Sequence, residues 1–178
     1  AKQTNASATQ KPTLFFFVLG ETARSQNYQL NGYQRPTNEF TQQQNVVSFQ
    51  DVASCGTATA TSLPCLFSSL SRDEYNESIA KNQDNVIDIL KRAGVSLLWK
   101  ENDGGDKDVA KNIDKTTLNR EEVNEFCNGN SCYDMALLEN LDSDIRNMQG
   151  NSVIFIHLMG SHGPNYFKRY PDNQKKFT

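Results

Sequence analysis

Long hydrophobic runs and strong charge are both missing from this sequence. Its longest apolar run, Leu14 to Leu19, is far shorter than the ~20 residues that a membrane-spanning helix needs. The sequence also lacks a basic start followed by an apolar stretch and a cleavage site, so we expect any targeting or anchoring segment to lie upstream. The net charge of −3, from 18 basic and 21 acidic residues, offers no positive field for a phosphate backbone. We therefore predict no nucleic-acid partner.

Internal repeats are absent as well, and 178 residues are enough for one domain with a core but too few for two of ordinary size. A content of 37% hydrophobic and 22% charged residues is close to that of globular proteins, so most of the chain should fold. Residues 1–12 are polar and show no period, which predicts a linker or the frayed start of a domain. We expect the folded domain to occupy residues 13–178.

Cysteine is scarce, and its four residues form two local pairs, Cys55 with Cys65 and Cys127 with Cys132. Structural zinc sites use closely spaced cysteine pairs that are duplicated or joined to histidines, whereas no histidine lies near either pair here. Two local disulfides explain the spacing better and favour an oxidising compartment. The alternative is four reduced thiols in a cytoplasmic protein.

Three apolar runs predict the strands of a parallel sheet. An unbroken run such as 13–19, which ends at Gly20, is typical of a strand buried on both faces. Between the runs, apolar residues recur at helical spacing. The strands are expected at 13–19, 95–99 and 153–159, and the helices at 84–93 and 133–149, with a shorter helix at 62–70. Strands and helices in alternation predict an α/β domain with right-handed crossovers.

Ionisable residues follow each predicted strand, where ligands bind in sheets of this kind. Glu21 follows the first strand and is either a hard-oxygen metal ligand or an ordinary polar residue at a strand end. The stretch 100–107 follows the second strand. His162 follows the third strand. Its possible roles are to bind a metal ion, to hold a phosphate, to act as acid or base, or to cap a turn. His157 lies inside the third strand, where a hydrogen-bonded core histidine is typical.

The segment from Cys55 to Cys65 is rich in hydroxyls just before a predicted helix. A hydroxyl there lies next to free backbone amides, which favour phosphate binding, although a simple helix N-cap explains such a residue too. Spacing does not choose among the hydroxyls of Thr57, Thr59 and Thr61. A threonine hydroxyl is a weak nucleophile that needs a base or a metal, and a carboxylate such as Glu21 would help to hold a zinc ion.

Several uncommon motifs occur together in one order, from about residue 13 to residue 177. They are Phe17-Val18-Leu19-Gly20-Glu21-Thr22-Ala23-Arg24, Asn31-Gly32-Tyr33, Ser54-Cys55-Gly56-Thr57 with Pro64-Cys65, Leu98-Trp99, and His157-Leu158-Met159-Gly160-Ser161-His162-Gly163-Pro164. This order resembles the lipid A phosphoethanolamine transferases, which include the mobile colistin-resistance enzymes.

The resemblance implies an α/β fold of the alkaline-phosphatase and sulfatase type, with a largely parallel sheet flanked by helices. It implies a monomeric periplasmic catalytic domain, attached to the Gram-negative inner membrane through N-terminal helices outside this chain. Members of the family use one or two zinc ions. They take phosphoethanolamine from phosphatidylethanolamine onto a threonine and pass it to a lipid A phosphate. The change reduces the negative charge that polymyxins, including colistin, recognise.

By position, the resemblance implies that Thr59 is the nucleophile and a zinc ligand, and that Glu21 is a second ligand. Lys107 and His162 correspond to positions that hold the phosphoethanolamine group. The resemblance also implies that His162 contacts a second zinc ion. Gly104 stands where some relatives have serine. The family's Asp–His zinc pair and a further histidine belong to a later segment. We therefore expect residues 13–178 to be the N-terminal part of a truncated catalytic domain, inactive alone.

Two other functions are compatible with the same residues. One is a related metal-dependent sulfatase, phosphatase or phosphoglycerol transferase on the same fold, although the paired cysteines around Thr59 argue against it. The other is a binding module without catalysis that is stabilised by its disulfides. In that case Glu21, Thr59 and His162 would come together by accident.

Overall fold

The protein folds around a four-stranded parallel sheet. In a computed structural model that describes residues 11–176, the strands follow the order β1-β4-β2-β3, and every neighbouring pair is parallel. The strands are β1 (Leu14–Leu19), β2 (Ser96–Glu101), β3 (Asp114–Thr117) and β4 (Ser152–His157). The predicted parallel sheet is confirmed, while most of the linker expected at residues 1–12 lies outside the described residues.

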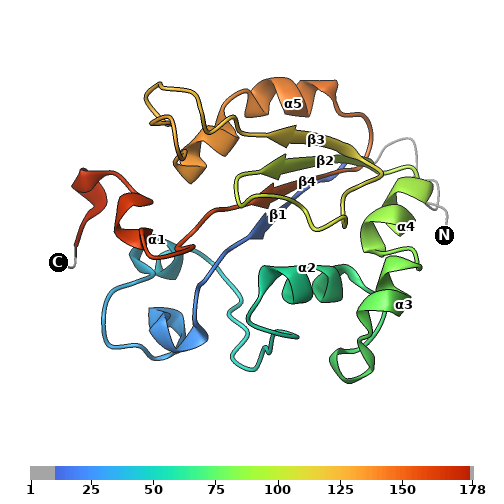
Figure 1. Cartoon of the computed structure of the whole chain (residues 1–178), viewed down its shortest axis with the longest axis horizontal. Helices are drawn as coiled ribbons and strands as arrows, with labels where there is room; N and C mark the ends of the chain where they lie inside the picture. The colour runs from blue at the N-terminus through green and yellow to red at the C-terminus, as the bar shows by residue number, and fades with distance from the viewer. Residues whose placement is uncertain (1–10, 177–178) are drawn as a thin grey trace.

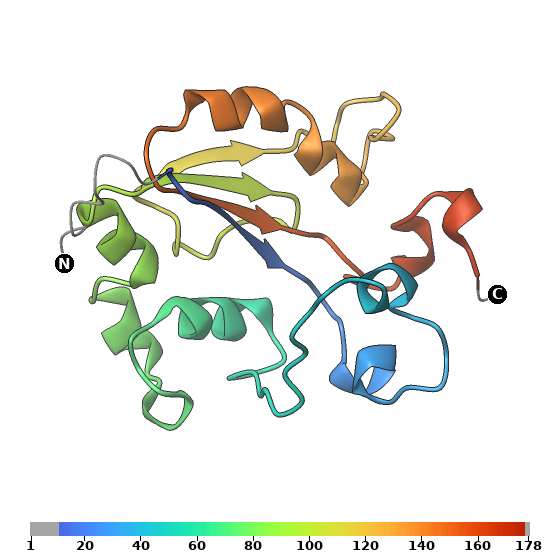
Figure 2. The ribbon, with the colours of Figure 1, turned by 180° about the vertical axis from the view of Figure 1, so that it is seen from behind.

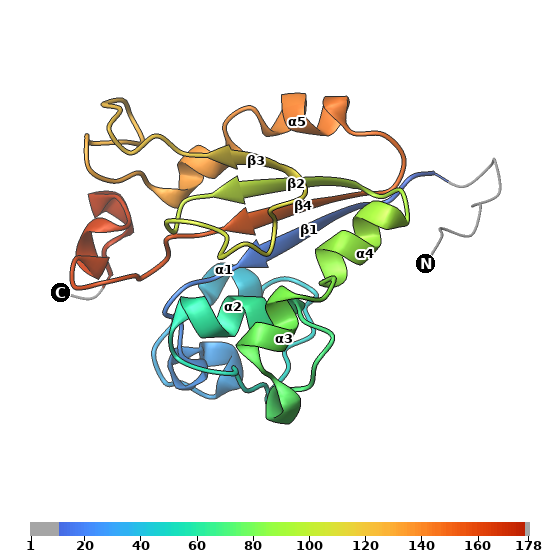
Figure 3. The same cartoon turned by 45° about the vertical axis from the view of Figure 1, so that its right-hand side comes forward.

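Helices cover both faces of this sheet (Figure 1, Figure 2). In Figure 3, α2, α3 and α4 lie on one side and α5 lies on the other. The helices are α1 (Glu39–Gln42), α2 (Thr59–Phe67), α3 (Glu77–Lys81), α4 (Val86–Arg92) and α5 (Leu141–Asn147). The 3-10 turns are η1 (Ser25–Asn27), η2 (Gln29–Asn31), η3 (Arg72–Glu74), η4 (Asp134–Leu138), η5 (Tyr166–Lys168) and η6 (Asp172–Gln174). Among residues 11–176, every helix is too short or too polar to span a bilayer.

The side chains of β4 alternate between two cores. Phe155 packs against Trp99 of β2 and Phe67 of α2, with ring centroids 5.6 and 5.7 Å away. Ile154 and Ile156 belong instead to the core beneath α5. Because successive strand residues point to opposite faces, a strand that is apolar throughout fits a position between two layers of helices.

The first strand differs from the prediction of burial on both faces. Phe15, Phe16 and Val18 of β1 are 54%, 40% and 57% exposed. Among residues 11–176, β1 lies at the edge of the sheet and pairs only with β4, so its side chains have fewer neighbours than those of a central strand. The prediction was wrong for β1, because an apolar run records the hydrophobicity of a strand and not its place in the sheet.

The single helix predicted at 133–149 is divided in two. η4 and α5 are separated by Glu139 and Asn140, and Asn140 has a φ of 61°. A residue in the left-handed conformation interrupts a right-handed helix, so the prediction of one continuous helix was wrong. β3 was missed, because its sequence Asp-Lys-Thr-Thr is polar and exposed and gives no apolar run.

The start of α4 is stabilised by a capping box. Asn85 Oδ1 accepts hydrogen bonds from the amides of Ile87 and Asp88, at 2.8 and 3.1 Å, and the Asp88 carboxylate accepts one from the Asn85 amide at 3.0 Å. These bonds satisfy amides at the helix start that have no partner within the helix.

Asn85→Ala is expected to lower the free energy of unfolding by about 1 kcal/mol, because it removes the cap acceptor. Urea unfolding of the variant and of the parent protein measures the difference. Asn165→Ala is a matched control, since Asn165 precedes η5 without a side-chain cap bond. An equal loss in both variants would contradict the capping argument.

Candidate active site

The carboxyl ends of β1, β2 and β4 bring Glu21, Asp103 and His162 together. One potential ligand atom of each residue lies within 4.8 Å of the other two. His162 Nδ1 is 3.7 Å from Glu21 Oε1 and 3.5 Å from Asp103 Oδ1. The prediction that Glu21 and His162 share one edge of the sheet is confirmed. Asp103 was missed, because the stretch after β2 contains several carboxylates and nothing in the sequence distinguishes them.

A close approach between the ends of β1 and β4 positions Glu21. Gly160 has a φ of 51°, and a Cβ there would lie 2.7 Å from the carbonyl oxygen of Glu21. The amide of Ser161 donates to the same oxygen at 3.3 Å. The Asp134 carboxylate accepts from the amides of Met159, at 2.7 Å, and Gly160, at 2.9 Å. The backbone that leads to His162 is therefore held by both Glu21 and Asp134.

Thr59 is the first residue of α2, and its hydroxyl donates to Glu21 Oε2 at 3.0 Å. The helix begins three residues before the predicted start at Ser62. Ala58 occupies the N-cap position, so the alternative in which Thr59 serves only as a cap is wrong. Within residues 11–176, the other hydroxyl that donates to the Glu21 carboxylate belongs to Thr22, at 2.7 Å. Thr59 is thus placed beside the predicted ligand.

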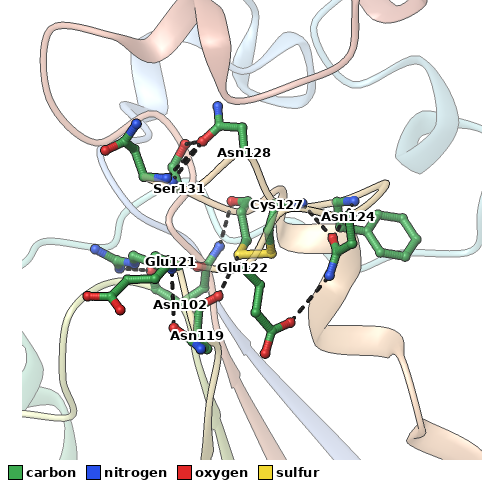
Figure 4. The surroundings of a disulfide bond; sticks show 12 residues. Asn102, Asn119, Glu121, Glu122, Asn124, Cys127, Asn128 and Ser131 are labelled. Carbon is green, nitrogen blue, oxygen red and sulfur yellow. Dashed lines mark hydrogen bonds between the residues drawn. A yellow bond between two sulfur atoms is a disulfide. The ribbon is translucent and has the colours of Figure 1, made fainter.

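Both predicted disulfides are present. Cys55–Cys65 connects the segment before α2 to the helix itself, so the bridge spans Thr59. The second disulfide, Cys127–Cys132, lies close to the end of β2, where Asn102 donates to the carbonyl oxygen of Cys132 at 3.1 Å (Figure 4). Each bridge therefore stabilises a segment that borders the cluster.

A buried network lies at the ends of β2 and β4. His157 Nδ1 is 2.9 Å from Glu101 Oε2, which also accepts a hydrogen bond from Trp99 Nε1 at 2.8 Å. Burial alone would raise the pKa of Glu101, but the hydrogen bonds from His157 and Trp99 outweigh it and lower this pKa to about 2. His157 is a hydrogen-bonded core histidine, as its place in an apolar strand predicts.

The two carboxyl groups of the cluster have opposite pKa shifts. Burial raises the pKa of Asp103 to about 6, and the charge of Glu21 adds to this effect. Burial acts in the same direction on Glu21, but hydrogen bonds from Thr22 and Thr59 and the charge of His162 outweigh it, so the pKa of Glu21 is lowered. A cation between the carboxylates would compensate their repulsion, and such perturbed groups are typical of functional sites.

Two cavities open beside Thr59 and share Glu21 and Ser62 as lining residues. One, of about 380 Å³, has an apolar wall that includes Leu63 of α2. The other, of about 670 Å³, is lined by polar groups that include Arg24. The candidate nucleophile therefore faces both an apolar and a polar space.

Lys107 lines another cavity than those beside Thr59. This cavity has a volume of about 240 Å³ and is also lined by Pro64 and Asp84. Its φ of 49° places it in a tight turn after β2. The predicted contact of Lys107 with the phosphoethanolamine group stays a prediction.

Comparison with known proteins identifies the family. The family model described as Sulfatase matches residues 13–178, which include the whole sheet and the residues of the cluster. The chain belongs to the sulfatase family. Among curated relatives of this sulfatase-family chain, phosphoethanolamine transferase EptA of Escherichia coli strain K12 is 43% identical over 169 residues, which are 95% of this chain and 31% of the relative. Phosphatidylethanolamine transferase Mcr-1 of Escherichia coli is 41% identical over 186 residues, and the alignment covers 100% of this chain and 34% of Mcr-1.

A solved structure agrees with the predicted fold of this sulfatase-family chain. The soluble domain of lipooligosaccharide phosphoethanolamine transferase A from Neisseria meningitidis matches it with a TM-score of 0.92 and 40% identity. The match covers 98% of this chain and 53% of that domain. The predicted resemblance and the sulfatase-like fold are confirmed. The chain spans about a third of the length of the two curated relatives and about half of the solved domain.

Proposed function

We propose that this sulfatase-family chain carries the nucleophile of a zinc-dependent enzyme that transfers phosphoethanolamine from phosphatidylethanolamine to a lipid A phosphate. The observation that carries the proposal is the hydrogen bond from Thr59 Oγ1 to Glu21 Oε2, at 3.0 Å, in the cluster where three strands end. The names of the relatives support phosphoethanolamine as the transferred group, phosphatidylethanolamine as its donor and a lipooligosaccharide as acceptor.

The residues present suit a zinc ion. Glu21 and Thr59 offer oxygen ligands, and in the described chain the buried Asp103 Oδ1 beside them lacks a hydrogen-bond partner. We propose Glu21 and Thr59 as zinc ligands, with the Asp–His pair of the family completing the set from outside residues 13–178. When bound, zinc supplies the Lewis acidity that a threonine hydroxyl needs to act as a nucleophile.

Thr59 and Glu21 are arranged for a transfer in two steps. Glu21 accepts the hydrogen bond of the hydroxyl and so orients Oγ1. Oγ1 attacks the phosphorus of the donor, the bond from phosphorus to the glycerol oxygen breaks, and diacylglycerol leaves with a proton. A hydroxyl oxygen of a lipid A phosphate then attacks the phosphorus bound to Thr59, the bond to Oγ1 breaks, and Oγ1 takes up the proton that the lipid A phosphate releases. Each phosphorus–oxygen bond broken is replaced by one formed.

The two cavities beside Thr59 fit the two parts of such a donor. The apolar wall near Leu63 suits the hydrocarbon part, and the guanidinium of Arg24 suits a phosphate oxygen. We propose that His162, whose side chain is 51% exposed next to Glu21, helps to hold the phosphoethanolamine group, together with Lys107.

The proposed setting is the periplasmic face of the Gram-negative inner membrane. Two disulfides suit an oxidising compartment, and both lipids belong to a membrane. We propose that residues 13–178 form the N-terminal part of a monomeric catalytic domain, anchored by a membrane domain outside this chain. Added ethanolamine would reduce the negative charge of lipid A and so produce resistance to polymyxins such as colistin.

Mass spectrometry tests the covalent step in the full-length protein. After incubation with phosphatidylethanolamine, the tryptic peptide that contains Thr59 is expected to carry a phosphoethanolamine adduct. Fragmentation should place the adduct on Thr59 and not on Thr57 or Thr61. Protein incubated without the lipid is the control. An unmodified peptide, or an adduct on another hydroxyl, would overturn the proposal.

A further inference from the structure

Asp134 connects the ends of two strands that carry the candidate site. It is the first residue of η4, and both oxygens of its half-buried carboxylate accept hydrogen bonds. Oδ1 accepts from the amide of Met159, at 2.7 Å, and Oδ2 accepts from the amide of Gly160, at 2.9 Å. Oδ1 also accepts from the side-chain amide of Asn102, at 2.8 Å. One carboxylate thus holds together the segment after β4 and the segment after β2.

The segments that Asp134 joins lead directly to the residues of the cluster. Gly160 lies two residues before His162 and leaves no room for a side chain against the backbone of Glu21. Asn102 immediately precedes the third carboxylate of the cluster. Hydrogen bonds to a charged carboxylate are stronger than those between neutral groups, so this junction is a firm one. A shift at Asp134 would therefore displace the Glu21 carboxylate from the candidate nucleophile.

The Cys127–Cys132 disulfide fixes the position from which Asp134 reaches the two strands. Cys132 lies two residues before Asp134 and is 3% exposed. Its carbonyl oxygen accepts from the side-chain amide of Asn102 at 3.1 Å, beside the disulfide (Figure 4). The side chain of Asn102 therefore donates to the disulfide segment and to Asp134 at once. Because a disulfide restricts the chain that it closes, this bridge limits how far Asp134 can move relative to β2.

Asp88 has the same kind of contacts in a part of the fold that does not lead to the cluster. Its carboxylate is also half-buried, and it accepts from the amide of Asn85, at 3.0 Å, and from the side-chain amide of Asn112, at 2.7 Å. These bonds hold the start of α4 and not the carboxyl end of a strand. A comparison of Asp134 with Asp88 therefore separates the effect of losing such bonds from the effect of their place.

We propose that Asp134 is a positioning residue of the transfer reaction, and that the Cys127–Cys132 disulfide acts on the active site through it. In the described chain, Asp134 is not among the residues that line the two cavities beside Thr59. It holds the ends of β2 and β4, and through them the carboxylate that orients the nucleophile. This inference rests on the proposed function, because it concerns the geometry in which Thr59 receives the phosphoethanolamine group.

Asp134→Asn tests the positioning role in the full-length protein. The substitution replaces one acceptor oxygen by a donor, which cannot accept from a backbone amide. We expect transfer to fall about 30-fold, since a displacement of 1 Å at reacting groups can cost about 10²-fold. Asp88→Asn is the matched control and should keep its transfer within about threefold of the parent protein. Both variants are compared at the same folded fraction, taken from their thermal unfolding, and an equal loss of transfer would overturn the role of Asp134.

Amide hydrogen exchange provides a readout that does not depend on transfer. We expect the peptide that contains Met159 and Gly160 to exchange on the order of tenfold faster in Asp134→Asn than in the parent protein. The same peptide should exchange at the parental rate in Asp88→Asn. An unchanged rate in Asp134→Asn would overturn the inference even if the protein transfers phosphoethanolamine. The adduct on Thr59 of the parent protein reports the proposed function separately, so the two failures are distinguishable.

A double-mutant cycle tests the route from the disulfide to the site. Cys127→Ser together with Cys132→Ser removes the bridge, and we expect a loss of transfer of about fivefold while Asp134 is present. If the bridge acts through Asp134, the same pair should change transfer less than about twofold in the Asp134→Asn background. A fivefold loss in both backgrounds would overturn this route. The tests with Asp134→Asn leave the cysteines intact, so they decide the role of Asp134 whether or not the protein folds without the bridge.

Discussion

Thr59→Ala is expected to abolish phosphoethanolamine transfer, with a loss on the order of 10³-fold or more. Alanine removes the hydroxyl that donates to Glu21 at 3.0 Å, and with it the oxygen that would carry the phosphoethanolamine. The fold should be retained, because Thr59 is only half-buried in the first turn of α2 and alanine favours helices. Transfer to lipid A, measured with purified full-length protein alongside its thermal unfolding, checks the prediction.

Two further variants separate the nucleophile from its surroundings. Thr57→Ala removes an exposed hydroxyl from the polar cavity beside Thr59, and we expect transfer to stay within about tenfold of the parent protein. Thr59→Ser retains the attacking oxygen and should form the adduct. The assignment of Thr59 would be wrong if Thr57→Ala lost as much transfer as Thr59→Ala, or if Thr59→Ala still formed an adduct.

Much of the sheet was predictable because apolar runs mark central strands. β2 and β4 lie within two residues of their predicted bounds, and α4 ends one residue before the predicted helix. Because Glu21 and His162 each follow a strand of a parallel sheet, they were predicted to lie on the same edge of the sheet, and this prediction needed no related protein. Local pairing of the cysteines predicted both disulfides.

The rest depended on contacts between distant segments. The exposure of β1 follows from its edge position, and β3 has too few apolar residues to be detected. Asp103 becomes a candidate ligand only because the buried Glu101 and His157 hold it there, although they are 56 residues apart in sequence. Thr59 could not be separated from Thr57 by spacing, and the resemblance to a family was needed to choose it.

Gly160→Ala is expected to reduce transfer by about 10²-fold, because the end of β4 leaves no room for a side chain. A Cβ at Gly160 would lie 2.7 Å from the carbonyl oxygen of Glu21 and 3.1 Å from its amide nitrogen. The obstacle is backbone, so the chain must move and carry the Glu21 carboxylate away from Thr59. The φ of 51° adds about 1–2 kcal/mol of strain in alanine. Steady-state transfer and zinc affinity of the full-length protein measure the effect.

Gly150→Ala separates strain from displacement of Glu21. Gly150 has a φ of 66°, similar to that of Gly160, but a Cβ there meets no atom within 4 Å. Gly150→Ala should therefore lose only the stability that corresponds to the backbone strain, and it should keep its transfer and its zinc affinity. If the two variants instead transferred equally well, the close approach of Gly160 to Glu21 would not be what positions this ligand. A loss confined to Gly160→Ala would make the carbonyl contact, and not backbone strain, the cause.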